Sequence, residues 1–548
     1  MKNKTEVKLI KNRAIIKFEG KNFLGEIGID GRIFKALTYA RISVGVISQQ
    51  AIENGISVLV HESDAEKAVN CLINEFEQER KSGKVSLIYS INNVSVIGFV
   101  SKDFNKIMSE LGRNNIFPLI LNQVAAENRV NIVVTSSQDE KAKNIIEAEI
   151  FAKPKTVHLA IIGHGNVGST LIDQVLESSE EIRNRKKIDL KIVAVANSKK
   201  IALNRSGFSE NWNEEILVAE RPSKVEELIA VANSKKIALN RSGFNENWSE
   251  EILVTERPSR VEELISFSQQ NQLENLIVVD NTASKEFVKN YPVLAENGFD
   301  LVSSNKIFNT LPISEYRNFR HILNKKNKKY LYETNVGAGL PLIDTIKLLH
   351  LSGENITRIK GVFSGSLSYI FNNFSVRDDN FSTILKDAME KGFTEPDPRE
   401  DLSGSDVARK LLILARELDL INEFSDIKIE NLVPENLRNL TKDDFISRLS
   451  ELDEVFDEVK KSQHKSHVLR FTGDLHGDLQ QEKGELDVKL ISVPADSALG
   501  QLKGSDSIFE IYTESYGENP IVIMGAGAGA KVTARGVFGD ILRLSENK

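Results

Sequence analysis

The sequence predicts a protein of mixed α/β and α+β class that folds into several domains. Residues 1–152 alternate strand-like and helix-like segments in the order βαββαβ, and they do so twice. An apolar strand at residues 156–162 then runs into a glycine-rich turn and a helix, which is how a parallel nucleotide-binding sheet begins. A chain of 548 residues has room for three or four domains.

Hydrophobic periodicity assigns the elements of the first 152 residues. Apolar residues that alternate or run together predict strands, and apolar residues three or four positions apart predict helices. Glu53-Asn54-Gly55 is a turn signal between two of the strands. The predicted strands are 12–20, 43–50, 55–62, 86–89, 94–100, 117–124 and 129–135, and the predicted helices are 23–41, 64–81, 103–115 and 138–151.

The composition is that of a globular protein and argues against nucleic acid as the main partner. The hydrophobic fraction is 41%, and the net charge of −7 lacks the basic excess that nucleic-acid binding requires. A single cysteine, Cys71, excludes an internal disulfide and a four-cysteine zinc site, as suits a reducing compartment. No apolar run approaches 18 residues, and the amino terminus lacks the apolar core of a signal peptide. We therefore expect a cytoplasmic protein without a membrane span.

A tandem repeat follows the glycine-rich turn. Residues 195–230 and 231–266 are identical at 31 of 36 positions. Two copies are too few for a solenoid, so a recent duplication is the better interpretation. A strand inserted between neighbours of a parallel sheet would displace a partner by about 4.8 Å, whereas a longer surface loop costs only about 0.6 kcal/mol per doubling of its length. We expect Val195–Asn197 to stay in the sheet and the spare copy to lie outside it.

The two halves of the first 152 residues also echo each other in sequence. Residues 47–54 (ISQQAIEN) answer residues 121–128 (LNQVAAEN), and the arrangement resembles the paired ACT domains that regulate aspartate kinases. The resemblance implies an amino-acid effector near the first strand–helix junction, where a helix N-terminus offers free N–H groups to a carboxylate. The alternative is a scaffold used only for pairing with another subunit. The candidate effector residues are Asn22, Gly25, Gln49 and Gln123.

The glycine-rich turn at residues 163–168 has the G-x-G-x-x-G spacing of dinucleotide-binding sites. The first glycine permits the tight turn, the second lets a pyrophosphate approach, and the third lets the helix pack on the strand. No acidic residue stands at the end of the next strand to bind the ribose of NAD, and two lysines there suit the 2′-phosphate of NADP. We predict NADP, with NAD as the alternative; a structural glycine turn and solvated lysines are the simpler interpretation. The residues concerned are Gly163, Gly165, Asn166, Val167, Gly168, Asn197, Ser198, Lys199 and Lys200.

Several later segments resemble one enzyme family, homoserine dehydrogenase. They are the strand ends VVDNTAS (278–284) and LVSSNK (301–306) and the strings YETNVGAGLP (332–341), GVFSGSLSYI (361–370) and GFTEPDPREDLSGSDVARK (392–410). With the first 152 residues, the chain resembles a bifunctional aspartokinase/homoserine dehydrogenase without its kinase domain. The resemblance implies reversible, NAD(P)H-dependent reduction of L-aspartate 4-semialdehyde to L-homoserine in threonine and methionine biosynthesis. It also implies regulation by an amino acid, with threonine expected, and a homo-oligomer, while kinase activity is expected to be absent.

The family motif carries its catalytic residues onto this chain. Lys306 and Lys410 correspond to the catalytic lysines, and Lys410 would be the general acid. Glu395, Asp401 and Asp406 would bind the substrate. Hydride addition builds negative charge on the carbonyl oxygen, and a nearby ammonium group can stabilise that charge and supply the proton. The simpler interpretation of Asp406 and Lys410 is an i,i+4 ion pair on a helix surface.

The resemblance also implies a monovalent cation, Na⁺ or K⁺. Glu333 and the carbonyls of Val336, Ala338 and Leu340 would be its ligands, because hard cations prefer carboxylate and carbonyl oxygens. A glycine-rich turn is the simpler interpretation. Thr282, Lys306, Gly527 and Gly529 complete the implied cofactor pocket.

The implied domain boundaries place two ACT-like units first and the dehydrogenase after them. The ACT-like units are of the ferredoxin-like type, and a Rossmann-type NADP-binding domain with the duplication follows. An α+β catalytic and dimerisation domain comes next, and a C-terminal segment then returns to the nucleotide domain. The predicted ranges are 1–84, 85–152, 153–310, 311–510 and 511–548.

A short motif, the single cysteine and the duplication each point to another function. The string GDLHG at 473–477 matches metallophosphoesterases, but the companion motifs of that two-metal site are missing from the sequence. Aspartate-semialdehyde dehydrogenase needs a cysteine nucleophile, and no motif surrounds Cys71. A catalytically impaired, ACT-based regulatory or assembly subunit stays open, because the duplication falls on the strand end that should select the cofactor.

Overall fold

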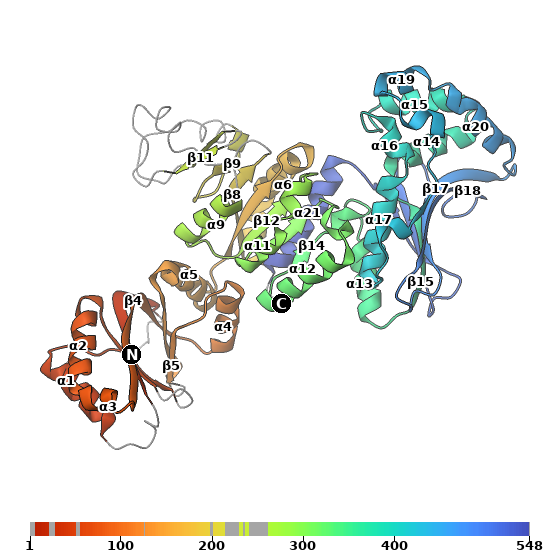
Figure 1. Cartoon of the computed structure of the whole chain (residues 1–548). Coiled ribbons are helices and arrows are strands. Elements are labelled where there is room, and N and C mark those ends of the chain that lie inside the picture. Colours follow the sequence, from red (N-terminus) through yellow and green to blue (C-terminus); the bar gives the residue numbers. More distant parts are fainter. Residues whose placement is uncertain are drawn as a thin grey trace. The chain divides into compact units, whose positions relative to one another are not determined.

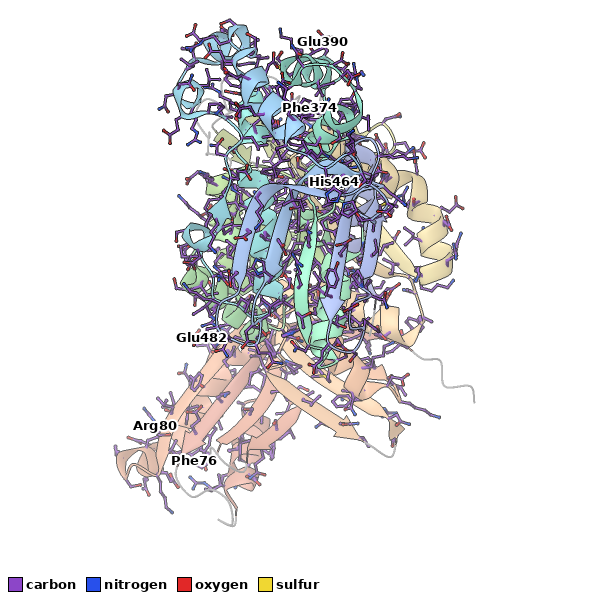
Figure 2. The ribbon with its side chains drawn as sticks, turned by 90° about the vertical axis from the view of Figure 1, so that its right-hand side faces the viewer. Phe76, Arg80, Phe374, Glu390, His464 and Glu482 are labelled. Atoms are coloured by element: carbon purple, nitrogen blue, oxygen red, sulfur yellow. The ribbon has the colours of Figure 1, made fainter. Side chains whose placement is uncertain are left out.

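The computed structural model describes residues 6–20, 28–50, 55–124, 127–197, 201–213, 230–233, 236–239 and 261–546. The chain divides into two compact units. The first consists of Met1–His158, Glu181–Leu190 and Arg260–Leu276, and the second of Leu159–Glu180, Lys191–Ser259 and Ile277–Lys548. Figure 1 shows the ribbon, and Figure 2 adds the side chains.

The first unit contains an antiparallel six-stranded sheet in the order β2-β3-β1-β4-β6-β5. Among the described residues, the predicted βαββαβ order is found once in full, and its second copy shares the long fourth strand with the first and has no final strand of its own in this sheet. Its strands are β1 (Lys8–Gly20), β2 (Ile47–Gln50), β3 (Gly55–His61), β4 (Val85–Val100), β5 (Ile120–Val124) and β6 (Arg129–Thr135). Its helices are α1 (Ile29–Tyr39), α2 (Ala65–Glu75), α3 (Glu77–Lys81), α4 (Phe104–Arg113) and α5 (Asp139–Ile150).

The predicted strands 86–89 and 94–100 form a single long strand, β4. Asn12 on β1 and Asn93 on β4 both have positive φ values, 58° and 56°, and the register between the two strands shifts around them. Asparagine tolerates this backbone region, and a bulge bends and twists a strand without ending it. Each long strand therefore runs through both halves of the sheet, and Lys8–Ile10 pairs with the part of β4 that also pairs with β6.

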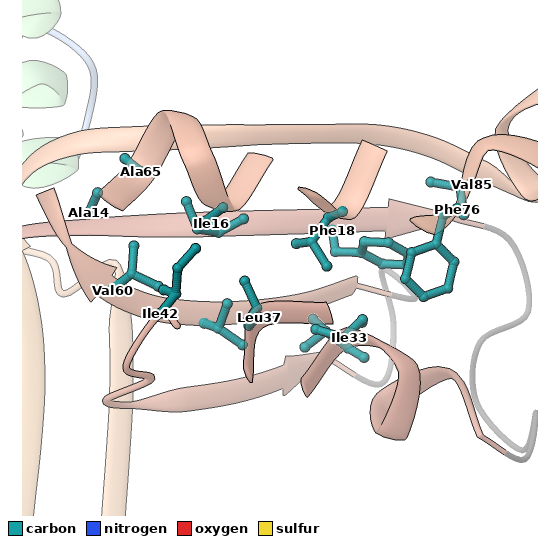
Figure 3. Close-up of a cluster of buried hydrophobic side chains, with 14 of the residues drawn as sticks. Ala14, Ile16, Phe18, Ile33, Leu37, Ile42, Val60, Ala65, Phe76 and Val85 are labelled. Atoms are coloured by element: carbon teal, nitrogen blue, oxygen red, sulfur yellow. The ribbon is translucent and has the colours of Figure 1, made fainter. Parts of the chain in front are cut away.

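Each half of this sheet buries its own hydrophobic core. In the first half Ile16, Phe18 and Leu37 pack with Phe76, whose ring meets Phe18 edge-on at 4.7 Å between centroids (Figure 3). Phe76 also separates α2 from α3, where a single helix was predicted over 64–81. The second half has an equivalent cluster, which includes Ile97, Ile107, Val130 and Ile146.

A loop after helix α9 (Val261–Gln270) is hydrogen-bonded to helices α4 and α5 within the first unit. The Asn275 N–H donates to Asn114 Oδ1 at 2.7 Å, and Asn114 Nδ2 donates back to Asn275 Oδ1 at 2.9 Å. Gln272 Oε1 accepts from the N–H groups of Glu140 and Lys141 at the start of α5. This loop therefore supplies the cap that the α5 N-terminus needs, a contact that the sequence alone did not predict.

A second six-stranded sheet has the order β14-β13-β12-β7-β8-β9. The pairs β12–β13 and β13–β14 are parallel, as predicted for a Rossmann-type domain. Its strands are β7 (Lys155–Ile162), β8 (Ile188–Ala196), β9 (Ile201–Leu203), β12 (Leu276–Asp280), β13 (Asp300–Ser303) and β14 (Tyr330–Leu331). The helices that follow these strands are α6 (Asn166–Lys186), α10 (Lys285–Val288), α11 (Tyr291–Glu296) and α12 (Ile313–Lys326).

The first copy of the duplicated segment supplies the strand of this sheet. Strand β8 ends with Val195 and Ala196 and lies next to β7. Strand β10 (Ala230–Asn233), which begins at the last residue of the first copy, and strand β11 (Lys236–Leu239) of the second copy form a separate two-stranded hairpin. The expectation that the strand of the first copy stays in the sheet is confirmed, and the described strands of the second copy lie outside it. The end of the second copy, residues 261–266, does not bulge outward as expected: it begins helix α9, where Leu264 and Ile265 are buried.

A third sheet, in the second unit, has the order β16-β18-β17-β15-β19-β20. Phe371, Phe374, Phe381 and Phe456 form an aromatic cluster among the helices beside it, where Figure 2 labels Phe374. The strands are β15 (Ile356–Val362), β16 (Lys428–Ile429), β17 (His467–His476), β18 (Glu485–Pro494), β19 (Ser507–Thr513) and β20 (Ile521–Gly525). The helices are α13 (Leu342–Leu351), α14 (Gly365–Val376), α15 (Phe381–Glu390), α16 (Pro398–Leu402), α17 (Ser405–Glu417), α18 (Glu435–Arg438), α19 (Lys442–Ser447), α20 (Glu451–Lys461) and α21 (Ala530–Ser545).

Two further observations concern the described residues. None of their helices is both long enough and apolar enough to cross a membrane. The GDLHG string lies on β17 and the turn after it, where Asp474 accepts a hydrogen bond from Arg358 Nε at 2.8 Å.

Candidate active site

The glycine-rich turn between β7 and α6 has the geometry of a dinucleotide-binding loop. Gly163 has φ 88°, a conformation that favours glycine, and its N–H donates to the Ala196 carbonyl of β8. A Cβ on Gly168 would overlap the Gly163 carbonyl oxygen, whereas a Cβ on Gly165 would meet nothing within 4 Å. Asn166 and Val167 begin α6, whose first N–H groups suit a phosphate. The turn therefore fits a nucleotide pyrophosphate.

We predict that Gly168→Ala and Gly165→Ala have different effects. Because the new Cβ at position 168 overlaps backbone, we expect an overpacking cost of about 1–3 kcal/mol and a melting temperature lower by at least about 2 °C without cofactor. Gly165→Ala has space, so it should melt like the wild type but bind NADPH more weakly. Thermal unfolding and NADPH fluorescence titration measure both effects, and equal melting temperatures would contradict the prediction.

Asn197, at the end of β8, lies beside the glycine-rich turn. Its Nδ2 is 3.0 Å from His164 Nε2 within that turn. His164 also meets the ring of Trp212 edge-on, and Trp212 Nε1 donates to Asp173 on α6 at 2.9 Å. The first-copy strand end is thus fixed against the predicted cofactor site. Ser198, Lys199 and Lys200 lie outside the described residues.

The ends of β7 and β12 approach each other closely at this turn. The Asn281 N–H donates to the Ile162 carbonyl at 2.8 Å. Thr282 Cγ2 lies 2.9 Å from the position that a Cβ on Gly163 would take. Thr282, predicted to line the cofactor pocket, therefore lies against the first glycine of the turn.

Lys306, Asp406 and Lys410 form one charged cluster. Lys410 Nζ lies 2.8 Å from Asp406 Oδ2, and Lys306 Nζ lies 3.6 Å from Asp406 Oδ1. Lys410 is 8% exposed and also donates to the Phe363 carbonyl at 2.8 Å. A surface ion pair between Asp406 and Lys410 would need neither the burial nor the second lysine, which comes from the end of β13. The Phe363 carbonyl was not among the predicted site groups.

The two lysines control the charge of Asp406. Burial alone would raise the pKa of this carboxyl, but the ammonium groups of Lys410 and Lys306 hold it well below its usual range. In turn, the Asp406 carboxylate raises the pKa of Lys306, while burial and the Lys410 charge lower it, and the balance lies below the ordinary lysine value. The cluster therefore presents an ionised carboxylate between two proton-donating groups.

Asp401 on α16 and Glu395 in the loop before that helix precede this cluster in the chain. The two oxygens of Asp401 accept hydrogen bonds from Ser366 Oγ at 2.6 Å and from the Glu395 N–H at 2.8 Å. Burial raises the pKa of Asp401, and burial together with the Asp401 charge raises the pKa of Glu395. Asp401 thus fixes the backbone at Glu395, and the Glu395 residue itself is exposed. Ser366 was not predicted, although it lies in one of the family strings.

Glu333 caps a helix as well as belonging to the predicted cation site. Its carboxylate accepts from the N–H groups of Ile343 at 2.8 Å and Asp344 at 3.0 Å, at the start of α13. Burial, with the nearby Asp540 charge, raises the pKa of Glu333 to about 7. Among the described residues, no cluster of three or more His, Cys, Asp or Glu side chains could hold a metal ion.

The predicted cation ligands fit a monovalent ion in their donor chemistry. Glu333 Oε1 accepts from both Ile343 and Asp344, whereas Oε2 accepts only from Asp344 and keeps a lone pair, although the Arg543 guanidinium lies 3.8 Å from it. Gly337 and Ala338 have positive φ values of 81° and 52°, so the chain turns sharply between the three carbonyl groups. Val336, Ala338 and Leu340 provide those carbonyls.

The C-terminal segment contacts the nucleotide-binding part of the second unit. Gly529 has φ 111° and directly precedes α21. A Cβ on Gly527 would overlap the Ser507 side chain, so only glycine fits there. Gln174 Nε2 on α6 donates to the Lys531 carbonyl at 3.2 Å. Gly527 and Gly529 therefore lie in a segment that is tied to the helix of the glycine-rich turn.

The predicted effector residues are only partly described. Gln49 lies on β2 and Gln123 on β5, and both are exposed on the edge strands of the first sheet. Asn22 and Gly25 lie outside the described residues.

This fold and site define a Rossmann-type oxidoreductase with an ACT-like region before it. The family description of homoserine dehydrogenase matches residues 341–542, and that of the ACT domain matches residues 16–76. The chain is 40% identical to the homoserine dehydrogenase of Emericella nidulans over 281 residues, which are 49% of this chain and 75% of that protein. The chain belongs to the homoserine dehydrogenase family.

Longer relatives align with nearly the whole chain, including the ACT-like region and the dehydrogenase region. The bifunctional aspartokinase/homoserine dehydrogenase of Buchnera aphidicola is 33% identical over 540 residues, which are 97% of this chain and 61% of that protein. The chain thus spans less than two thirds of that relative's length. Among solved structures, a Candida auris protein of unknown function has 30% identity and a TM-score of 0.59, over 72% of this chain and 99% of its own. A putative homoserine dehydrogenase from Archaeoglobus fulgidus, at 21% identity and a TM-score of 0.51, shares the fold over 71% of this chain and 100% of its own.

Proposed function

We propose that the chain is a homoserine dehydrogenase that interconverts L-aspartate 4-semialdehyde and L-homoserine with NADP. The observation that carries this proposal is the cluster of Lys306, Asp406 and Lys410 in a chain of this family. Lys306 and Asp406 are 100 positions apart in the sequence, yet Lys306 Nζ and Lys410 Nζ both lie within 3.6 Å of the Asp406 carboxylate. Bound NADPH would supply the hydride, which this chain's side chains cannot provide.

Each charged residue of the cluster has a role in this proposal. Lys410 donates a proton to the carbonyl oxygen as negative charge develops there, and Lys306 stabilises the same charge. Asp406 raises the pKa of Lys306 and, with Glu395, binds the substrate ammonium. Asp401 orients Glu395 through its backbone N–H. The Phe363 carbonyl holds the Lys410 ammonium in place between turnovers.

The finer parts of the proposal rest on residue chemistry. NADP is favoured because Asn197, Ser198, Lys199 and Lys200 include no carboxylate that would repel a 2′-phosphate. Residues 333–340 would bind Na⁺ or K⁺. Threonine is proposed as the ACT effector, in a cytoplasmic homo-oligomer with the domain boundaries given above.

The test of this proposal is homoserine-dependent reduction of NADP by the purified chain, followed by the NADPH absorbance. NADP should be used with a higher kcat/KM than NAD, and threonine should inhibit. L-Serine, which lacks one methylene, is the control substrate. If the folded chain binds NADPH but neither oxidises homoserine nor reduces L-aspartate 4-semialdehyde, the proposed function is wrong.

Deletion of residues 231–266 tests whether the duplication impairs the enzyme. The impaired-subunit alternative is not favoured by the sheet, in which β8 of the first copy keeps its place beside β7. We predict that the deletion variant folds and has the wild-type KM for NADP, because residues 225–230 replace the nearly identical 261–266. Steady-state kinetics of both chains decide the point. A large gain of activity on deletion would show that the duplication does disrupt the site.

A further inference from the structure

Asp280 is a buried carboxylate at the end of β12 that has no role in the proposed chemistry. It is 1% exposed, and three hydrogen-bond donors converge on it. The Thr282 N–H lies 2.8 Å from Oδ1, while Tyr291 Oη and Asn305 Nδ2 lie 2.7 and 3.1 Å from Oδ2. Only a side chain with two acceptor oxygens can satisfy all three donors at once.

One of these bonds shapes the cofactor side of the site. The bond from the Thr282 N–H closes a turn of the Asx type, two residues beyond Asp280. That turn brings Thr282 against Gly163, where its methyl group lies 2.9 Å from the position of a Cβ. The next residue after Asp280, Asn281, bonds to the end of β7. The position of Thr282, which lies against the glycine-rich turn, therefore depends on Asp280.

A second bond reaches the catalytic side. Asn305 directly precedes Lys306, and its Nδ2 donates to Asp280 while its Oδ1 accepts from the Ile307 N–H at 3.0 Å. The Asn305 side chain thus links Asp280 to the Ile307 N–H, and Lys306 lies between Asn305 and Ile307 in the chain. Asn305 is 3% exposed, and its Nδ2 also donates to the Ser284 carbonyl at 3.2 Å and lies 3.5 Å from Thr282 Oγ1. Loss of the Asp280 carboxylate therefore removes the shortest of these bonds and leaves the amide to the other two acceptors.

The third bond anchors the carboxylate to the scaffold. The Tyr291 ring is fully buried and stacks on Phe308 at 5.0 Å between centroids. Its hydroxyl lies between Asp280 Oδ2 and Ser303 Oγ, which is 2.8 Å away. A rigid aromatic group therefore fixes the orientation of the carboxylate, which is the support that a precise site needs.

We propose that Asp280 is a positioning residue that holds Thr282 against the glycine-rich turn and Lys306 toward Asp406 at the same time. One carboxylate then positions both the loop after β12, which lines the cofactor site, and the loop after β13, which carries Lys306. The distance between cofactor and catalytic lysine is therefore set by a single residue. This inference rests on the proposed function, since it assigns Thr282 and Lys306 their roles from it.

Asp280→Asn is the variant that tests the inference. In either orientation the new NH₂ faces an N–H donor, from Thr282 on one side or from Asn305 on the other. Because a misplacement of 1 Å can cost about 100-fold in rate, we expect kcat to fall by roughly 10- to 100-fold. NADPH should also bind more weakly, whereas the KM for homoserine, which Glu395 and Asp406 set, should change little.

Two further variants separate positioning from stability. Asp474→Asn alters an equally buried carboxylate on β17, far in sequence from the site, and should lower the melting temperature without changing kcat. Tyr291→Phe removes one donor and keeps the ring, so its kcat should lie between those of the wild type and Asp280→Asn. If tyrosine acts through the carboxylate, the double variant Asp280→Asn/Tyr291→Phe should lose no more activity than Asp280→Asn alone.

The outcomes distinguish this inference from the proposed function. A folded Asp280→Asn variant with wild-type kcat and NADPH affinity would overturn the inference. If Asp280→Asn does not fold, an unchanged kcat in Tyr291→Phe overturns it. If the wild type binds NADPH but does not oxidise homoserine, the proposed function fails, and a weaker NADPH affinity in Asp280→Asn than in Asp474→Asn still supports the positioning of Thr282. A wild type that binds no NADPH overturns both.

Discussion

Replacement of Lys410 by methionine is expected to lower kcat for homoserine oxidation by about 10²–10⁴-fold, the usual contribution of a general acid or base. Methionine keeps most of the side-chain volume and removes the ammonium that lies 2.8 Å from Asp406 and from the Phe363 carbonyl. The KM for NADP should stay close to the wild-type value, because Lys410 contacts no residue of the glycine-rich turn in the described part of the chain. Steady-state kinetics in both directions measure the effect.

The neighbouring residue provides a matched control for this variant. Arg409 carries the same charge on the same helix, but it is exposed, and its guanidinium lies over the Phe424 ring at 5.8 Å. Arg409→Met should therefore retain nearly all activity. If Lys410→Met and Arg409→Met lose similar amounts, Lys410 contributes only general positive charge and is not the proton donor.

The backbone architecture was the more predictable part of this protein. Period-two and period-3.6 patterns are local, so the strands and helices of both βαββαβ halves could be assigned from their own residues. The exceptions have local physical causes that the pattern does not contain. Asn12 and Asn93 permit a bulge where a strand end was expected, and Phe76 enters the core where a continuous helix was expected.

The geometry of the candidate site was less predictable, because it depends on contacts between distant segments. Family strings identified Lys306, Asp406 and Lys410, but not that one carboxylate would lie between both lysines. In the sequence Asp280 is only the last residue of a predicted strand, and its three donors come from different parts of the chain. Gln272 was not singled out at all, since a loop residue that caps a helix 130 positions away leaves no periodic signal.

Replacement of Asp406 by asparagine should lower kcat/KM for homoserine by about 10²–10³-fold. Truncation of one partner of a hydrogen-bonded charge pair between a protein and what it binds costs about 2–5 kcal/mol, and the top of that range is not expected because the Asp406 side chain is 45% exposed and solvent screens its charge. Without the carboxylate, the Lys306 and Lys410 ammonium groups repel each other, and the substrate ammonium loses a counter-charge.

The pH profile of this variant should move in a defined direction. The Asp406 carboxylate is the largest influence that raises the pKa of Lys306, while burial and Lys410 lower it. Its loss therefore lowers the pKa of Lys306 further below the ordinary value. Reduction of the semialdehyde needs Lys306 in its protonated form, which prevails below that pKa. The decline of the reduction rate on the alkaline side of the pH profile should therefore shift to lower pH.

Acid cannot imitate the substitution, because the two lysines hold the pKa of Asp406 well below its usual range. A depressed pKa means that the carboxylate stabilises the fold fully above its ordinary value of 3.8, and that this contribution is lost only as the pH falls through the lower folded value. Asp419→Asn, at an exposed position two residues beyond the end of the same helix, is the control and should leave the profile unchanged. An Asp406→Asn variant with a wild-type alkaline limb would contradict the role assigned to this carboxylate, because it would separate the charge of Lys306 from it.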